Sequence, residues 1–170
     1  MSGLDLSLLS SGDAVVALRT YPRRYRNSLA PLPDDPDAVD ALAHRIGPAG
    51  ASAIHLLTDT VRTIEVLGQA LHQIVYSDDA VLHPGVTDPQ QRQWEQPVVG
   101  TVADGMAELT DAANDLAEAA DKVSGKGWRR QGVVAGTGQQ VAAIDVLREA
   151  VRTAADNLTS IDATLRAARS

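Results

Sequence analysis

The stretch VAAIDVLREAVRTAADNLTSIDATL, residues 141–165, carries the most regular apolar pattern in the sequence. Its apolar residues recur at alternating spacings of three and four: Ile144, Leu147, Val151, Ala154, Leu158, Ile161 and Leu165. A stripe of this kind is typical of a helix that packs at about 20° to its neighbours, as in a four-helix bundle. The pattern therefore predicts a long helix over residues 139–168.

Proline- and glycine-rich breaks separate further helical segments upstream of this stretch. Their apolar spacing predicts long helices over residues 13–29, 50–76 and 99–123, and a short helical turn near 38–45. Strand signals are few, because pairs such as Val133-Val134 are too short to indicate a sheet. We therefore predict an all-α fold: a four-helix bundle in up-down order, with one long loop between its second and third long helices.

Two features interrupt the helical pattern. Pro22 stands inside the first predicted helix and is expected to kink or split it. Residues 77–97 form a connection of a length that is often functional in a compact domain. Because Trp94 is the single large aromatic residue of this connection, we expect Trp94 and the loop to cover one mouth of the bundle.

Length and composition favour one soluble globular domain over residues 1–170, with residues 1–12 as a loosely ordered tail. The chain has 170 residues, of which 44% are hydrophobic and 22% are charged. It contains no cysteine, which excludes disulfides, thiolate metal sites and a cysteine nucleophile. No apolar run reaches the ~18 residues of a membrane span, and the first residues do not form a signal peptide, so a cytoplasmic protein without membrane contacts is expected.

The net charge is −7 at pH 7, which disfavours binding to nucleic acids because such a surface repels phosphate. The acidic residues are densest on the outer face of the predicted helix over 99–123: Asp104, Glu108, Asp111, Asp115, Glu118 and Asp121. A solvated helix face is the ordinary interpretation of such a row, and a contact face for a partner protein is the alternative.

Polar residues that border the apolar stripes are the candidates for a ligand pocket, because the sequence contains no catalytic motif. His55, Asp59 and Arg62 share one flank of the second long helix at about 100° per residue. A comparable flank of the last helix holds five polar residues: Asp145, Arg148, Glu149, Arg152 and Asp156. The same spacings also suit ordinary surface ion pairs, which stabilise a helix by a few tenths of a kcal/mol.

Three stretches give the sequence a resemblance to a known family: ALRTYPRRYRNSLAPLPDD at 17–35, GASAIHLLTDTVR at 50–62, and residues 141–165. They resemble the DinB/YfiT-like superfamily, particularly actinobacterial members near the mycothiol-dependent maleylpyruvate isomerase N-terminal domain. The resemblance implies a four-helix bundle that is often a homodimer. It also implies a divalent metal, usually zinc or nickel, and activity as a thiol S-transferase or isomerase with a low-molecular-weight thiol.

The metal-ligand positions of the family do not match in this sequence. The histidine of the second helix corresponds to Asp59, and the ligand pair of the last helix corresponds to Arg152 and Asp156. Arginine cannot ligate a metal, since its guanidinium stays protonated. We therefore expect no metal, and an ion cluster in which Arg152 bridges Asp156 and Asp59.

The leading hypothesis is a DinB-like bundle without the metal triad that binds a small molecule between its helices or runs a metal-independent reaction. The candidate pocket residues are His55, Asp59, Arg62, Trp94, Arg152 and Asp156. One alternative is a metal-dependent thiol transferase or isomerase with an atypical ligand set. Another alternative is a non-enzymatic bundle that binds a partner protein.

Overall fold

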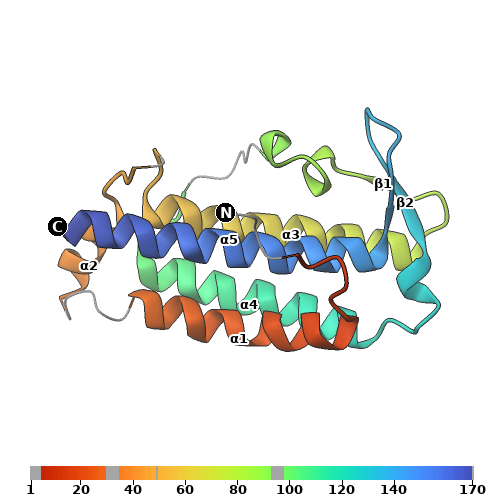
Figure 1. Cartoon of the computed structure of the whole chain (residues 1–170), viewed down its shortest axis with the longest axis horizontal. Coiled ribbons are helices and arrows are strands. Elements are labelled where there is room, and N and C mark those ends of the chain that lie inside the picture. Colours follow the sequence, from red (N-terminus) through yellow and green to blue (C-terminus); the bar gives the residue numbers. More distant parts are fainter. Residues whose placement is uncertain (1–4, 30–34, 49, 93–97, 170) are drawn as a thin grey trace.

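Four long helices lie side by side in the computed structural model, which describes residues 5–29, 35–48, 50–92 and 98–169 (Figure 1). The helices are α1 (Ser11–Leu29), α2 (Pro36–Ala43), α3 (Ala53–Tyr76), α4 (Val102–Asp121) and α5 (Ala143–Arg169). The long helices α1, α3, α4 and α5 form the bundle, and the short α2 lies at one end of it (Figure 1). The predicted four-helix bundle is confirmed.

Polar caps set the first residue of several helices, as the sequence pattern indicates. The side chain of Ser52 accepts a hydrogen bond from the backbone N–H of His55 at the start of α3. Thr101 accepts in the same way from Asp104 at the start of α4. The expected split at Pro22 is wrong, because α1 continues through this residue as one helix. Burial of Tyr21 and Pro22 in the core offsets the one helical hydrogen bond that proline cannot donate.

The strictly alternating up-down order is also corrected, because α3 and α4 run in the same direction (Figure 1). Residues early in α3 contact residues early in α4, and residues later in α3 contact residues later in α4. A Cβ added at Gly105 would lie 2.5 Å from Leu57, and further along α3 one added at Gly68 would lie 3.9 Å from Leu116. Helix α1 is antiparallel to α4 (Figure 1), and Arg19 in the middle of α1 pairs with Asp121 at the end of α4. A connection must therefore return along the whole bundle between α3 and α4.

That return connection is the segment from residue 77 to residue 101, which we call the crossover segment. It includes β1 (Val81–Leu82) and two 3₁₀ helices, η1 (Pro84–Val86) and η2 (Pro89–Gln91). Its described part follows the side of the bundle along α3, and η1 packs against that helix (Figure 1). Strand β1 thus lies at one end of the bundle and η1 and η2 lie along its side (Figure 1), and Trp94, which was expected to cover the mouth with this loop, lies outside the described residues.

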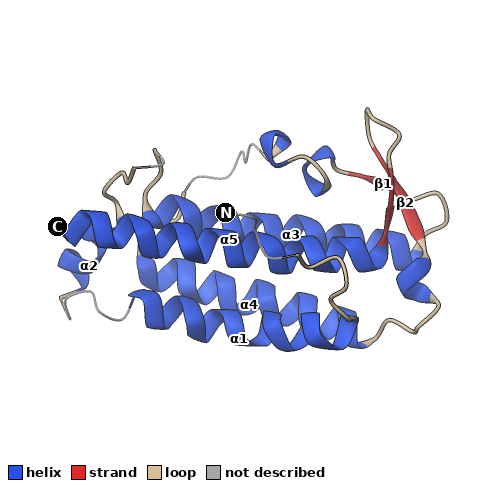
Figure 2. Cartoon of the chain, viewed as in Figure 1, coloured by secondary structure: helices blue, strands red, loops and turns tan. Residues whose placement is uncertain are grey.

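The fold is all-α as predicted apart from a small sheet at one end of the bundle (Figure 2), so the expectation that Val133-Val134 is too short for a strand is wrong. Strand β1 pairs in parallel with β2 (Gln131–Val134), and β2 pairs with β3 (Gln140–Ala142) in antiparallel register. Burial alternates along β2, so that Val134 faces the core and Val133 faces solvent. The 3₁₀ helix η3 (Gly127–Arg129) precedes β2. The sheet holds the crossover segment against the connection between α4 and α5.

The apolar stripes of the four long helices meet in the hydrophobic core, as predicted. Tyr25, Leu147 and Ile161 are fully buried, and Leu158 is buried with 5% of its surface exposed. Leu6 and Leu9, which precede α1, pack against this core. Among the described helices, none combines the length and the apolarity needed to span a membrane.

Candidate functional site

A polar network joins α1, α3 and α5 and includes Asp59, one of the pocket residues expected from the sequence. The amide of Asn157 on α5 donates to the Asp59 carboxylate at 3.0 Å and to the Thr60 hydroxyl at 2.9 Å. The Thr60 hydroxyl is in turn 3.1 Å from the hydroxyl of Tyr25, which donates to the Ala154 carbonyl at 2.7 Å. The sequence analysis identified Asp59 here but missed Asn157, Thr60 and Tyr25.

Burial raises the pKa of the Tyr25 hydroxyl well above its ordinary value, although the hydrogen bond with Thr60 acts in the opposite direction. Tyr25 is therefore a neutral hydroxyl at physiological pH, and its hydrogen bonds hold α1 against α3 and α5. This arrangement is structural, because the Tyr25 side chain has no exposed surface through which it could reach a ligand.

Arg152 forms its ion pair with Glu149, one turn earlier on α5, where the sequence analysis expected bridges to Asp59 and Asp156. The Nε of Arg152 donates to Glu149 at 2.9 Å, and 45% of the arginine side chain is exposed. Asp156 is exposed on α5, and His55 is exposed on α3. These positions follow from helix geometry, since residues three and four apart on one helix meet more easily than residues on neighbouring helices.

The guanidinium of Arg92, in the crossover segment, lies against the other side of the Glu149 carboxylate. It donates to the Glu149 carboxylate at 2.7 Å, to the Gly85 carbonyl at 2.6 Å and to the Thr153 hydroxyl at 3.3 Å. Only 5% of the Arg92 side chain is exposed. A cation buried this deeply requires such partners. The pair fastens the crossover segment to α5, and the sequence analysis missed it because Arg92 lies in an aperiodic loop.

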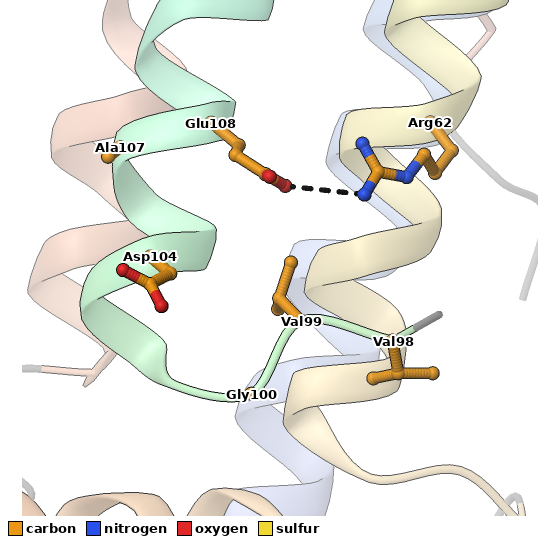
Figure 3. A pocket seen from close by; sticks show the side chains of 7 residues that line it. All are labelled: Arg62, Val98, Val99, Gly100, Asp104, Ala107 and Glu108. Atoms are coloured by element: carbon orange, nitrogen blue, oxygen red, sulfur yellow. Dashed lines mark ion pairs between the residues drawn. The ribbon is translucent and has the colours of Figure 1, made fainter. Parts of the chain in front are cut away.

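Arg62 lies on the opposite side of α3 and points toward α4, where it borders a pocket between the two helices (Figure 3). The pocket has a volume of about 420 Å³, within the range of small-molecule sites. Its wall is formed by Arg62 on α3, by the segment Val98, Val99 and Gly100, and by Asp104, Ala107 and Glu108 on α4. We call it the Arg62 pocket.

Hydrogen bonding in the Arg62 pocket is incomplete. The Arg62 terminal nitrogen NH1 donates to Glu65 at 3.3 Å, and NH2 faces the Glu108 carboxylate at 3.6 Å across the pocket (Figure 3). The Arg62 Nε and the Glu108 Oε2 are buried without a hydrogen-bond partner among the described residues. Buried polar groups are nearly always hydrogen-bonded, so two unpaired atoms beside one pocket indicate a place where a polar molecule would be bound.

Two smaller pockets lie elsewhere on the described surface. One, of about 310 Å³, continues along the groove between α3 and α4 beside His72 and Asp115. The other, of about 260 Å³, lies between the crossover segment and the start of α5 beside Glu149. In the latter pocket the Glu149 carboxylate already has two arginine partners, which leaves the Arg62 pocket as the stronger candidate.

Comparison with solved structures identifies the architecture. No protein-family model matches the sequence, and no curated protein gives a significant match. Among solved structures, the chain is similar to YfiT from Bacillus subtilis, described as a probable metal-dependent hydrolase with an unusual four-helix bundle topology. The TM-score is 0.74 at 10% sequence identity, with 98% of this chain and 91% of YfiT covered. The chain has the YfiT-like fold. The resemblance to the DinB/YfiT-like superfamily is thus confirmed for the fold.

The residues that the sequence resemblance assigns to metal-ligand positions, Asp59, Arg152 and Asp156, do not fit a metal ion. Arg152 brings a permanent positive charge that is already paired with Glu149. The Asp59 carboxylate accepts a hydrogen bond from the Asn157 amide. Within the described ranges, no group of three or more His, Asp or Glu side chains is arranged to hold a metal. We derive no metal chemistry for this YfiT-like bundle.

Proposed function

We propose that this YfiT-like bundle binds a small molecule in the Arg62 pocket and does so without a bound metal. The observation that carries the proposal is a pair of buried atoms, Arg62 Nε and Glu108 Oε2, that have no hydrogen-bond partner among the described residues and lie at the wall of a pocket of about 420 Å³. A bound molecule that offers one acceptor and one donor would satisfy both atoms at once.

The ion pairs around Arg152 favour a binding role elsewhere in the bundle over catalysis at the expected ligand positions. Arg152, and Arg92 beside it, are both engaged with the carboxylate of Glu149, so neither cation is available to hold a ligand there. The Arg62 pocket instead combines one cation, two carboxylates and the apolar surfaces of Val98, Val99 and Ala107. Mostly apolar walls with a few convergent polar groups are typical of small-molecule sites.

The alternative of a protein-binding face on α4 is less well supported, because part of its acidic row is paired within the chain. Glu108 faces Arg62, and Asp121 pairs with Arg19 at 2.6 Å. The sequence pattern showed no cation within this row, since both partners come from neighbouring helices. The acidic face is therefore less charged than its sequence indicates.

The binding proposal can be tested by two-dimensional NMR titration of the full chain with small carboxylates, amines and amino acids at millimolar concentration. We expect at least one of these probes to shift the backbone signals of Val99, Gly100 and Glu108 and the Nε–H signal of Arg62. The same titration of Arg62→Gln should lose these shifts, whereas Arg19→Gln, which alters an exposed pair on the far end of α4, should keep them. Absence of pocket shifts with every probe would overturn the proposal.

The metal-free part of the proposal needs its own measurement. The protein is purified after growth with added zinc and nickel, and its metal content is measured by elemental analysis. We expect less than stoichiometric metal. A stoichiometric metal that survives dialysis would favour the thiol transferase or isomerase alternative and contradict a metal-free site.

A further inference from the structure

The edge of the Arg62 guanidinium formed by Nε and NH2 makes no hydrogen bond with the described residues. NH1 is engaged by Glu65, but NH2 is 3.6 Å from Glu108, which is too long for a hydrogen bond, and Nε has no partner among the described residues. Nε and NH2 together form one side of the planar guanidinium, and two parallel N–H groups of this kind match the two oxygens of a carboxylate. The free edge of Arg62 is therefore a carboxylate-binding fork.

The opposite wall of the pocket requires a donor. The Glu108 Oε2 is buried without a hydrogen bond, and Asp104 lies one turn earlier on the same helix. A ligand that carried only a carboxylate would meet these two negative charges, while a ligand that carried only an amine would leave the Arg62 fork unsatisfied. A molecule with both a carboxylate and an ammonium group satisfies the two sides together.

The spacing of the two sides limits the separation of the two ligand charges. Arg62 NH2 and Glu108 Oε2 face each other directly at 3.6 Å, so a ligand that parts them by a small side-chain movement must carry its carboxylate and its ammonium group close together. The two groups of an α-amino acid are attached to one carbon and meet this condition. The remaining wall, formed by Val98, Val99 and Ala107, offers apolar contact to a small side chain.

We propose that the Arg62 pocket binds a small apolar α-amino acid, whose carboxylate lies on the Nε–NH2 edge of Arg62 and whose ammonium group lies between Glu108 and Asp104. This inference rests on the proposed small-molecule function and names its ligand class. The 3.6 Å contact between Arg62 and Glu108 then opens to admit the ligand, and each of the two side chains exchanges a poor contact for hydrogen bonds of normal length.

The test compares three probes that differ by one group each: L-valine, isovalerate, which lacks the amine, and isobutylamine, which lacks the carboxylate. Each is titrated into the full chain and followed by calorimetry and by NMR shifts at Val99, Gly100 and Glu108. We expect L-valine to bind at least about tenfold more tightly than either analogue, because each analogue leaves one buried polar group of the site unpaired.

Matched variants test whether Arg62 on α3 and Glu108 on α4 are responsible for the binding of L-valine. Arg62→Gln and Glu108→Gln should each weaken L-valine binding at least about tenfold, while Arg19→Gln should leave it unchanged. Circular dichroism checks that each variant is folded. If one is not, the three-probe comparison on the unaltered protein decides the question.

The outcomes separate this inference from the proposed function. Pocket shifts with isovalerate or isobutylamine at an affinity equal to that of L-valine would overturn the amino-acid ligand and leave small-molecule binding intact. Pocket shifts with none of the three probes, but with another small molecule of the wider titration, would overturn it in the same way. Absence of NMR shifts at the pocket residues with every probe would overturn both the amino-acid ligand and the proposed small-molecule function.

Discussion

Replacement of Arg92 by methionine should destabilise the protein far more than replacement of Arg152 by methionine, although both arginines contact the same carboxylate. The Arg92 side chain is 5% exposed and Glu149 is 14% exposed, whereas Arg152 is 45% exposed. Removal of one partner from a buried ion pair costs about 3–5 kcal/mol. Because Glu149 keeps Arg152 as a counter-charge, we expect about 3 kcal/mol, the lower end of this range, for Arg92→Met.

The exposed arginine gives the matched control. A solvent-exposed ion pair contributes about 0.2–1 kcal/mol, so Arg152→Met should cost less than about 1 kcal/mol. For a chain of this size, 1 kcal/mol corresponds to about 2–4 °C in Tm. The expected decreases in Tm are therefore about 6–12 °C for Arg92→Met and less than about 4 °C for Arg152→Met.

The assay is urea unfolding followed by far-ultraviolet circular dichroism, with limited proteolysis to detect local release of the crossover segment. The double variant Arg92→Met with Glu149→Leu should recover about half or more of the lost free energy of unfolding, because an apolar pair leaves no buried charge. Equal effects of Arg92→Met and Arg152→Met would refute the argument, since they would show that Arg92 is solvated and does not fasten the crossover segment to α5.

Further predictions concern the core and the buried network. Leu158→Ala, at the centre of the α5 stripe, should cost about 2–5 kcal/mol in urea unfolding, and a loss below about 0.5 kcal/mol would contradict the burial of that face. Tyr25→Phe removes the hydroxyl that binds the Ala154 carbonyl and Thr60, and should lower the free energy of unfolding by about 1–2 kcal/mol at neutral pH. Because burial raises the pKa of Tyr25 in the folded state, the unfolded chain releases this proton first as the pH rises, and stability should fall above about pH 10. Urea midpoints measured from about pH 9 to about pH 11 should show a shallower decline in Tyr25→Phe than in the unaltered protein; identical slopes would show that Tyr25 does not contribute.

The long helices were predictable because each carries its own signals. The apolar stripe of residues 141–165 acts within one segment, so no knowledge of the fold is needed to recognise it. The caps Ser52 and Thr101 were not recognised, and the predicted starts at 50 and 99 lie three residues before the observed starts of α3 and α4. The direction of α4, in contrast, was not predictable from the sequence. A connection as long as residues 77–101 can return to either end of the bundle, and nothing in its sequence decides between them. The small sheet was missed for a related reason, since β1 and β2 are too short to show a period and lie far apart in the chain.

The candidate site was predicted in part for a geometric reason. Asp59 and Arg62 are three residues apart on α3 and therefore about 60° apart around the helix, which the sequence analysis treated as one flank. That angle is enough for Asp59 to reach Asn157 on α5 while Arg62 reaches Glu108 on α4. Which neighbour each residue meets depends on where α4 and α5 pack, and this is fixed by the topology rather than by the helix itself. Arg92 could not be predicted at all, since a loop side chain has no periodicity to reveal its partner.

The crossover segment is much longer than its path requires. Helix α3 has 24 residues and spans about 36 Å at a rise of 1.5 Å per residue, whereas residues 77–101 could reach about 80 Å if fully extended. A direct return would need about half of them. The surplus length lets one connection wind through strand and 3₁₀ turns and deliver Arg92 to α5 and Val98 and Val99 to the wall of the Arg62 pocket. Insertions and deletions in this segment can therefore change what the bundle recognises without moving any of its four long helices.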